Sequence, residues 1–96
     1  MFVVLLTYTA PLDAVDRHVP AHRQFLERQY AAGVFLLSGR KEPRDGGVIL
    51  ATAASRAQLD AVLAQDPFML HGIADYQVLE FHPTMGAPAV NGWLEG

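Results

Sequence analysis

The sequence has no cysteine and only one lysine among its 96 residues. The absence of cysteine excludes disulfides, thiolate catalysis and cysteine metal sites. The net charge is −3 and no run of basic residues occurs, so nucleic acid is not expected as a partner. The longest apolar run, Phe2 to Leu6, is too short to span a membrane and lacks the flanks of a signal peptide. We therefore expect a cytoplasmic protein that binds neither nucleic acid nor a membrane.

Charged residues are also scarce, at 18%, whereas hydrophobic residues reach 51%. A chain of this length forms one domain with a modest core. The apolar excess therefore predicts a surface that a second subunit covers.

Six segments have the patterns of regular structure, and they follow one another in the order βαββαβ. We predict strands at residues 2–9, 34–41, 48–53 and 76–82 and helices at residues 13–32 and 55–65. This order is that of the ferredoxin-like α+β fold, a four-stranded antiparallel sheet with two helices on one face. The first strand is apolar on both of its faces, so the face away from the helices also needs a cover. We expect a second copy there, giving a homodimer that forms a dimeric α+β barrel.

The first helix carries signals for its start, its interruption and its end. Asp13 is a candidate N-cap, and Gly33 is a candidate C-cap. Pro20 predicts a short first turn followed by a main helix that starts near Val19. Ser55 is the candidate N-cap of the second helix.

The end of the sequence differs in composition from the rest. Residues 83–96 hold two prolines and three glycines, and residues 84–96 are expected to form a tail that can dock through Trp93 and Leu94. The domain itself is expected to span residues 1–83.

His22 is the histidine that the helical pattern singles out. It precedes Phe25 and Leu26 by three and four residues and shares their apolar stripe, whereas Arg23 falls on the solvent side. A histidine on such a stripe is more often a satisfied core residue than a catalyst, and both interpretations stay open. If the helix starts nearby, its dipole keeps the imidazole neutral and favours a general base.

Asp66 continues the apolar stripe of the second helix, four residues after Val62 and seven after Leu59. The carboxylate would then point inward at a helix C-terminus, unless a frayed last turn leaves it in solvent. In the βαββαβ order this end of the second helix lies beside the first part of the first helix. We therefore expect His22 and Asp66 to meet as an oriented general base.

Four further residues are expected to line a substrate pocket at the same edge of the sheet. Ser38 and Arg40 share one strand face and can meet Tyr8 and His71 there. Arg40 could bind an anionic group and Ser38 could orient the substrate. The alternatives, a polar filler for Ser38 and a solvated charge for Arg40, carry at least equal weight.

No metal or cofactor is expected. His18 and His22 have the spacing of zinc ligands, but Pro20 lies between them and no HExxH motif is present. No phosphate-binding loop occurs, and His71 and His82 are more often surface residues in such contexts.

Three segments, VPAHRQFL, LLSGR and QDPFMLHG, resemble the YCII-related (YciI-like) family in their order and spacing. The resemblance implies a dimeric ferredoxin-like barrel with a His–Asp active site at His22 and Asp66. One branch of that family removes hydrogen chloride from chlorinated hydroxyquinols. Many relatives have Gly-Pro where this chain has Gly39-Arg40, a difference that bears on the shape and polarity of the pocket.

Two functions follow from these observations. The first is a cofactor-free enzyme that uses His22 and Asp66 for elimination or isomerisation of a small cyclic or aromatic substrate. The second is a non-catalytic module that binds a small ligand or dimerises, in which His22 and Asp66 form a structural pair.

Overall fold

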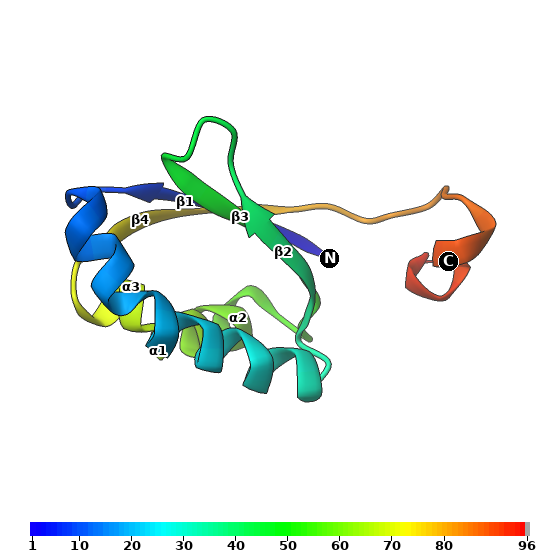
Figure 1. Cartoon of the computed structure of the whole chain (residues 1–96). Helices are drawn as coiled ribbons and strands as arrows, with labels where there is room; N and C mark the ends of the chain where they lie inside the picture. Colours follow the sequence, from blue (N-terminus) through cyan, green and yellow to red (C-terminus); the bar gives the residue numbers. More distant parts are fainter. Residues whose placement is uncertain (96) are drawn as a thin grey trace.

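The computed structural model describes residues 1–95. The elements are β1 (Phe2–Tyr8), α1 (Leu12–Ala31), β2 (Phe35–Arg40), β3 (Gly46–Ala51), α2 (Arg56–Leu63), α3 (Pro67–Leu70), β4 (Ala74–Glu80) and the 3-10 helix η1 (Pro88–Trp93). The strands form one antiparallel sheet in the order β2-β3-β1-β4. All three α-helices lie on the same face of this sheet (Figure 1). The predicted ferredoxin-like α+β fold is confirmed, with β3 and β4 each starting two residues earlier than predicted.

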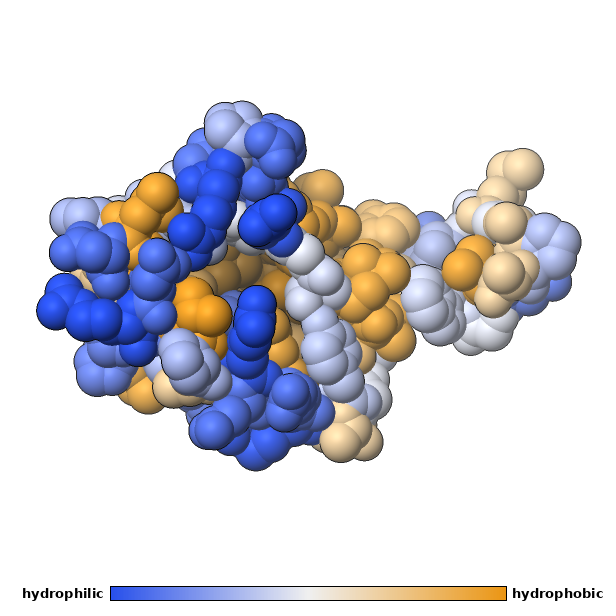
Figure 2. Space-filling view, viewed as in Figure 1, coloured by the Kyte–Doolittle hydropathy of each residue, from blue (hydrophilic) through white to orange (hydrophobic). Residues whose placement is uncertain are grey.

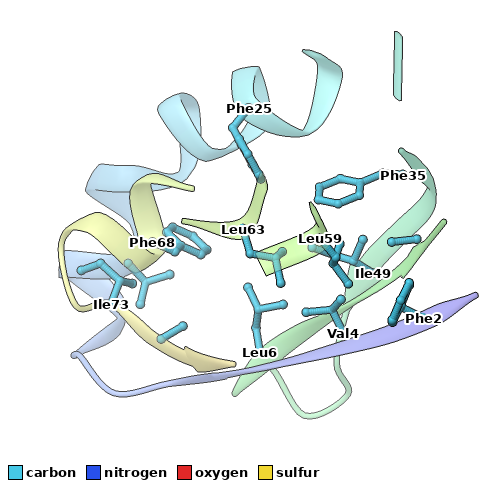
Figure 3. Packing of buried hydrophobic residues seen from close by; sticks show 13 residues of the cluster. Phe2, Val4, Leu6, Phe25, Phe35, Ile49, Leu59, Leu63, Phe68 and Ile73 are labelled. Atoms are coloured by element: carbon cyan, nitrogen blue, oxygen red, sulfur yellow. The ribbon is translucent and has the colours of Figure 1, made fainter. Parts of the chain in front are cut away.

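The core lies between the sheet and the helices. Phe2, Val4 and Leu6 alternate along β1 and are almost fully buried on the helix side. Phe25 of α1 and Leu59 of α2 pack against this side of the sheet (Figure 3). Burying an aliphatic or aromatic side chain of this size contributes about 1.5–3 kcal/mol, so this layer dominates the stability of the domain.

Helix α1 runs without a break through Pro20, and the predicted interruption is wrong. The proline removes one backbone hydrogen bond, to the carbonyl of Asp16. Both residues are exposed, so water can hydrate the free carbonyl and the helix continues. The helix starts at Leu12 after an extended Pro11, which occupies the N-cap position predicted for Asp13.

Helix α1 ends next to Gly33, close to where the sequence predicts. The C-cap is Ala32, and Gly33 directly after it has a φ of +76°. Residues with a side chain rarely adopt this left-handed conformation, so Gly33 allows the chain to leave the helix and enter β2.

The structure corrects the predicted place of Asp66. Ser55 caps α2 as predicted, but α2 ends at Leu63, three residues before Asp66. A residue before proline is driven toward extended backbone, and Asp66, before Pro67, has φ −66° and ψ 125°. Asp66 is therefore the N-cap of the short helix α3 and not the last residue of α2.

The face of the sheet away from the helices carries an unbroken apolar row. The strand register aligns Leu37, Leu50, Val3 and Leu79, one residue from each of the four strands. Leu37 is 51% exposed and Leu79 is 58% exposed. No helix covers this face within the described part of the chain (Figure 1).

The chain after β4 extends away from the sheet, and η1 lies apart from the helices (Figure 1). Glu95 returns to His82, with its Oε2 2.6 Å from Nδ1, and lies 3.5 Å from the N-terminal ammonium. Trp93 is 37% exposed, and within the single chain the segment after β4 does not pack on the sheet or the helices (Figure 1). Between residues 1 and 95, no helix has the length and apolarity needed to cross a membrane.

Candidate functional site

Asp66 is completely buried, and three donors surround its carboxylate. Oδ1 accepts a hydrogen bond from the Phe68 N–H at 2.9 Å and lies 2.8 Å from His22 Nδ1. Oδ2 accepts a hydrogen bond from the Tyr76 hydroxyl. Because a charge is costly to bury without partners, these donors explain how an acid sits in the core. An ionised carboxylate accepts from all three groups.

Tyr76 reaches Asp66 from β4, where it faces the helices between Ala74 and Val78. Burial, together with the hydrogen bond to Asp66 and the charge of that carboxylate, raises the pKa of Tyr76 well above its usual value. The phenol therefore keeps its proton and acts only as a donor to Asp66.

His22 lies near the middle of the 20-residue helix α1. The expected effect of the helix dipole does not apply, because that effect is confined to the first and last turns. The ring stacks on Phe68, with centroids 4.0 Å apart and planes 4° from parallel. Stacking on one side and the bond to Asp66 at one edge leave the imidazole little freedom to rotate.

The two ring nitrogens of His22 have different environments. Nδ1 faces Asp66, which in its ionised form can only accept, so the neutral imidazole carries its proton on Nδ1. Nε2 has no protein partner, and within residues 1–95 no buried side-chain nitrogen or oxygen lacks one. Nε2 is thus accessible and presents a lone pair, the state of a general base.

A cleft of about 490 Å³ separates α1 from the β2–β3 hairpin, and His22 borders it. Figure 2 shows a hollow with a hydrophobic floor and hydrophilic residues around its mouth. The helix contributes Val19, His22, Arg23 and Leu26, which follow the i, i+3, i+4, i+7 spacing of one helical face. A cleft of this size suits a small molecule.

Three of the four predicted pocket residues line this cleft. Ser38 and Arg40 face it from β2, and Tyr8 faces it from the end of β1. The Ser38 hydroxyl also forms a hydrogen bond with the Tyr30 hydroxyl of α1. His71 does not line the cleft, and the expectation for it is wrong.

His71 instead stacks on His18 at the protein surface, with ring centroids 4.4 Å apart. His18 lies in the first half of α1, and His71 lies at the end of α3. Among residues 1–95, no three histidine, aspartate or glutamate side chains gather in the way a metal site requires.

Sequence reasoning missed Tyr76, Phe68 and Arg23. The alternation of β4 put Tyr76 on the same face as Val78, so its inward direction could have been found. Arg23 is exposed, as predicted, but it also borders the cleft, because the wall is formed by α1 and β2 together. No sequence pattern gives the distance between those two elements.

Comparison with solved structures finds the same fold in an enzyme. The 5-chloro-2-hydroxyhydroquinone dehydrochlorinase TftG from Burkholderia phenoliruptrix AC1100, in complex with 2,5-dihydroxybenzoquinone, matches with a TM-score of 0.72 and 18% sequence identity. The match covers 86% of this chain and 95% of that chain. At this identity the likeness shows a shared fold. No curated protein matches the sequence.

Comparison with protein families gives a match over most of the chain. The YCII-related domain matches residues 1–82, which include every strand and α-helix of the structure. The protein belongs to the YCII-related family.

Proposed function

We propose that the protein is an enzyme that performs general acid–base chemistry on a small cyclic or aromatic molecule, with His22 as the base. The observation that carries the proposal is the pair of His22 and Asp66 at the wall of the cleft. Nδ1 is held by a fully buried carboxylate, while Nε2 is accessible. A packed imidazole oriented by a carboxylate is the arrangement used for proton transfer.

In the proposed reaction, His22 Nε2 takes a proton from a C–H or O–H group of the substrate. The electron pair left behind either expels a leaving group such as chloride or shifts to another atom of the substrate. The imidazolium that results is stabilised by the negative charge of Asp66 at 2.8 Å. In an isomerisation the imidazolium returns its proton to the shifted electron pair, and after an elimination it passes the proton to solvent; either transfer restores the base. The hydroxyl of Ser38, on the β2 wall, orients the substrate.

The fold of TftG supports a reaction of this class, because that protein is a dehydrochlorinase and was solved with a quinone ligand. Elimination of hydrogen chloride from a ring also requires a base that takes a proton from the substrate. The reaction proposed here needs no cofactor.

We also propose that the protein works as a homodimer through the open face of its sheet. The row of Leu37, Leu50, Val3 and Leu79 is too apolar and too exposed for a surface that stays in water. Two copies packed face to face would bury both rows in a dimeric barrel.

The test compares His22→Gln with His71→Gln on a panel of halogenated hydroquinones, halogenated phenols and small cyclic acids. Chloride release and product mass are the measurements. His22→Gln should lower turnover by about 10²–10⁴-fold, the usual share of a general base. His71 is exposed and outside the cleft, so its variant should keep full activity.

Equal turnover by the two variants would remove His22 from the mechanism. If wild type binds panel members but converts none, the non-catalytic binding module becomes the better description. In that case the burial of Asp66 has a purely structural purpose, and His22→Gln lowers only the melting temperature.

A further inference from the structure

The charged side chains that line the cleft are all arginines. Its lining includes Arg23 from α1, Arg40 from β2 and Arg44 from the hairpin loop. No aspartate or glutamate is among the lining residues, although the chain carries a net charge of −3. The positive potential at this site is therefore a local feature that the composition does not explain.

One of the three arginines is already neutralised. Arg44 forms an ion pair with Asp16 of α1, at 2.5 Å between Nη2 and Oδ1. Arg23 and Arg40 have no ion-pair or hydrogen-bond partner among the side chains of residues 1–95. Arg23 lines the cleft from α1 and Arg40 lines it from β2, and both residues are exposed, so their side chains can bind a ligand.

Apolar side chains, one of them aromatic, form a continuous part of the remaining lining, beside His22, Ser38 and Tyr8. The apolar side chains that line the cleft are Leu6, Val19, Leu26, Val48, Ile49 and Phe68. The hydrophobic floor is visible in Figure 2 below the hydrophilic mouth. Such a floor suits the face of a flat ring, whereas the arginines at the mouth suit a negative group.

We propose that the substrate is a flat-ringed organic anion, with its ring on the apolar floor beside His22 and its charged group between Arg23 and Arg40. This inference rests on the function proposed above and adds the charge of the substrate to it. Carboxylate is the negative group best matched to guanidinium, because two oxygens accept two parallel N–H bonds. A fixed negative group at the mouth also sets which ring atom lies near Nε2 of His22.

The test measures binding alone, so that its outcome does not depend on turnover. Isothermal titration and amide chemical shifts would compare 4-hydroxybenzoate with the neutral 4-hydroxybenzamide, which has the same shape. The acid should bind at least about tenfold more tightly at low salt, which corresponds to about 1.4 kcal/mol. This preference should shrink as the ionic strength approaches about 0.15 M, because partly exposed charges are screened.

Two variants locate the charge, and a third controls for net charge. Arg23→Gln and Arg40→Gln should each weaken 4-hydroxybenzoate binding by about fivefold or more and leave the amide unchanged. Arg28→Gln removes the same charge from the same helix as Arg23, but Arg28 does not line the cleft. Its variant should bind both probes as wild type does.

Three results would overturn the proposal. The first is equal affinity for the acid and the amide. The second is that Arg28→Gln weakens binding of the acid as much as Arg40→Gln does. The third is no binding of the acid up to about 10 mM, which corresponds to a binding free energy weaker than about 3 kcal/mol. Inorganic phosphate serves as a second probe, and binding as tight as that of 4-hydroxybenzoate would show that the floor contributes nothing.

The same titrations on His22→Gln separate this proposal from the proposed reaction. If His22→Gln still binds the acid more tightly than the amide, the proposed anion site is supported even when His22 has no role in turnover. If the enzyme converts only neutral panel compounds, the proposed acid–base reaction is supported and the proposal of an anionic substrate is contradicted.

Discussion

The Tyr76 hydroxyl donates its hydrogen bond to Oδ2 of Asp66, the carboxylate oxygen that His22 does not contact. The Asp66 carboxylate thus joins β4 to α1 through its two oxygens. The Tyr76 hydroxyl and the Phe68 N–H hold the carboxylate in one orientation, and the carboxylate in turn holds the orientation of the His22 imidazole. Tyr76 is accordingly a positioning residue for His22, although it does not line the cleft.

The first prediction concerns the ionisation of Tyr76. Its raised pKa means that the unfolded chain loses the phenolic proton first, near pH 10, while the folded chain retains it. The contribution of Tyr76 to stability is complete below about pH 10 and is lost as the pH rises further. Above that pH, the free energy of unfolding should fall by up to about 1.4 kcal/mol per pH unit from this group.

Urea unfolding at a series of pH values, on wild type and Tyr76→Phe, measures this slope. The variant should lack the Tyr76 share of the slope and should be less stable at neutral pH by about 1–2 kcal/mol, since Asp66 loses a donor. Phenolate absorbance gives an independent readout. If wild type and variant show the same slope above pH 10, Tyr76 ionises while folded and the hydrogen bond is weaker than the geometry indicates.

The second prediction separates the two tasks of Asp66, capping α3 and orienting His22. Asparagine caps a helix as well as aspartate does, so Asp66→Asn should keep α3. The loss of charge-assisted bonds should cost about 1–3 kcal/mol of unfolding free energy. Nitrogen NMR of His22 should show the neutral proton shifting from Nδ1 toward a mixture of Nδ1 and Nε2, which would weaken the base.

Asp60→Asn is the matched control for that variant. Asp60 is exposed and, among the residues that the structure describes, its carboxylate pairs only with Arg56 one turn away, so its loss should cost less than about 1 kcal/mol. An Asp66→Asn spectrum identical to that of wild type would mean that the carboxylate does not select the tautomer.

The fold could be predicted because its signals are local and agree with one another. The apolar faces of residues 2–6, the glycine at residue 33 and the cap at Ser55 each mark one element, and the order of elements allows few topologies. The approach of His22 to Asp66 followed from that topology, since it brings two distant segments to one edge.

The predictions that were wrong concern single residues whose effect depends on the structure around them. Pro67 drives Asp66 into extended backbone and starts α3, an effect that the helical spacing of Leu59, Val62 and Asp66 does not show. Pro20 is predicted to interrupt α1, but Pro20 and Asp16 are both exposed residues and the helix continues. Arg23 was assigned to solvent because the sequence does not show how far β2 stands from α1.

The third prediction concerns Gly46 at the start of β3. A Cβ atom on Gly46 would lie 1.7 Å from the carbonyl oxygen of Leu6, which is backbone of the central strand and cannot move aside. Gly46→Ala should therefore cost several kcal/mol of unfolding free energy and disturb the floor of the cleft. In Gly39→Ala the added atom meets nothing within 4 Å, so that control should unfold within about 1 kcal/mol of wild type. Similar unfolding free energies for the two variants would show that β1 and β3 are further apart.

The last prediction tests the homodimer through the open face of the sheet. Leu79 ends the apolar row on β4 and is 58% exposed in the single chain. A glutamate there would place a charge in the proposed interface, where it would lose its water without gaining a partner. Leu79→Glu should therefore sediment as a monomer of 10.5 kDa, while wild type sediments at about twice that mass.

Met85→Glu supplies the control for added charge. Met85 lies in the tail and is 90% exposed, away from the row of Leu37, Leu50, Val3 and Leu79. That variant should remain a dimer. A monomeric wild type at high micromolar concentration would show that the apolar row has another cover, and a dimer that survives Leu79→Glu would move the interface to a different face. The helix side already carries the cleft, so such a result would also require the partner to leave the mouth of that cleft open.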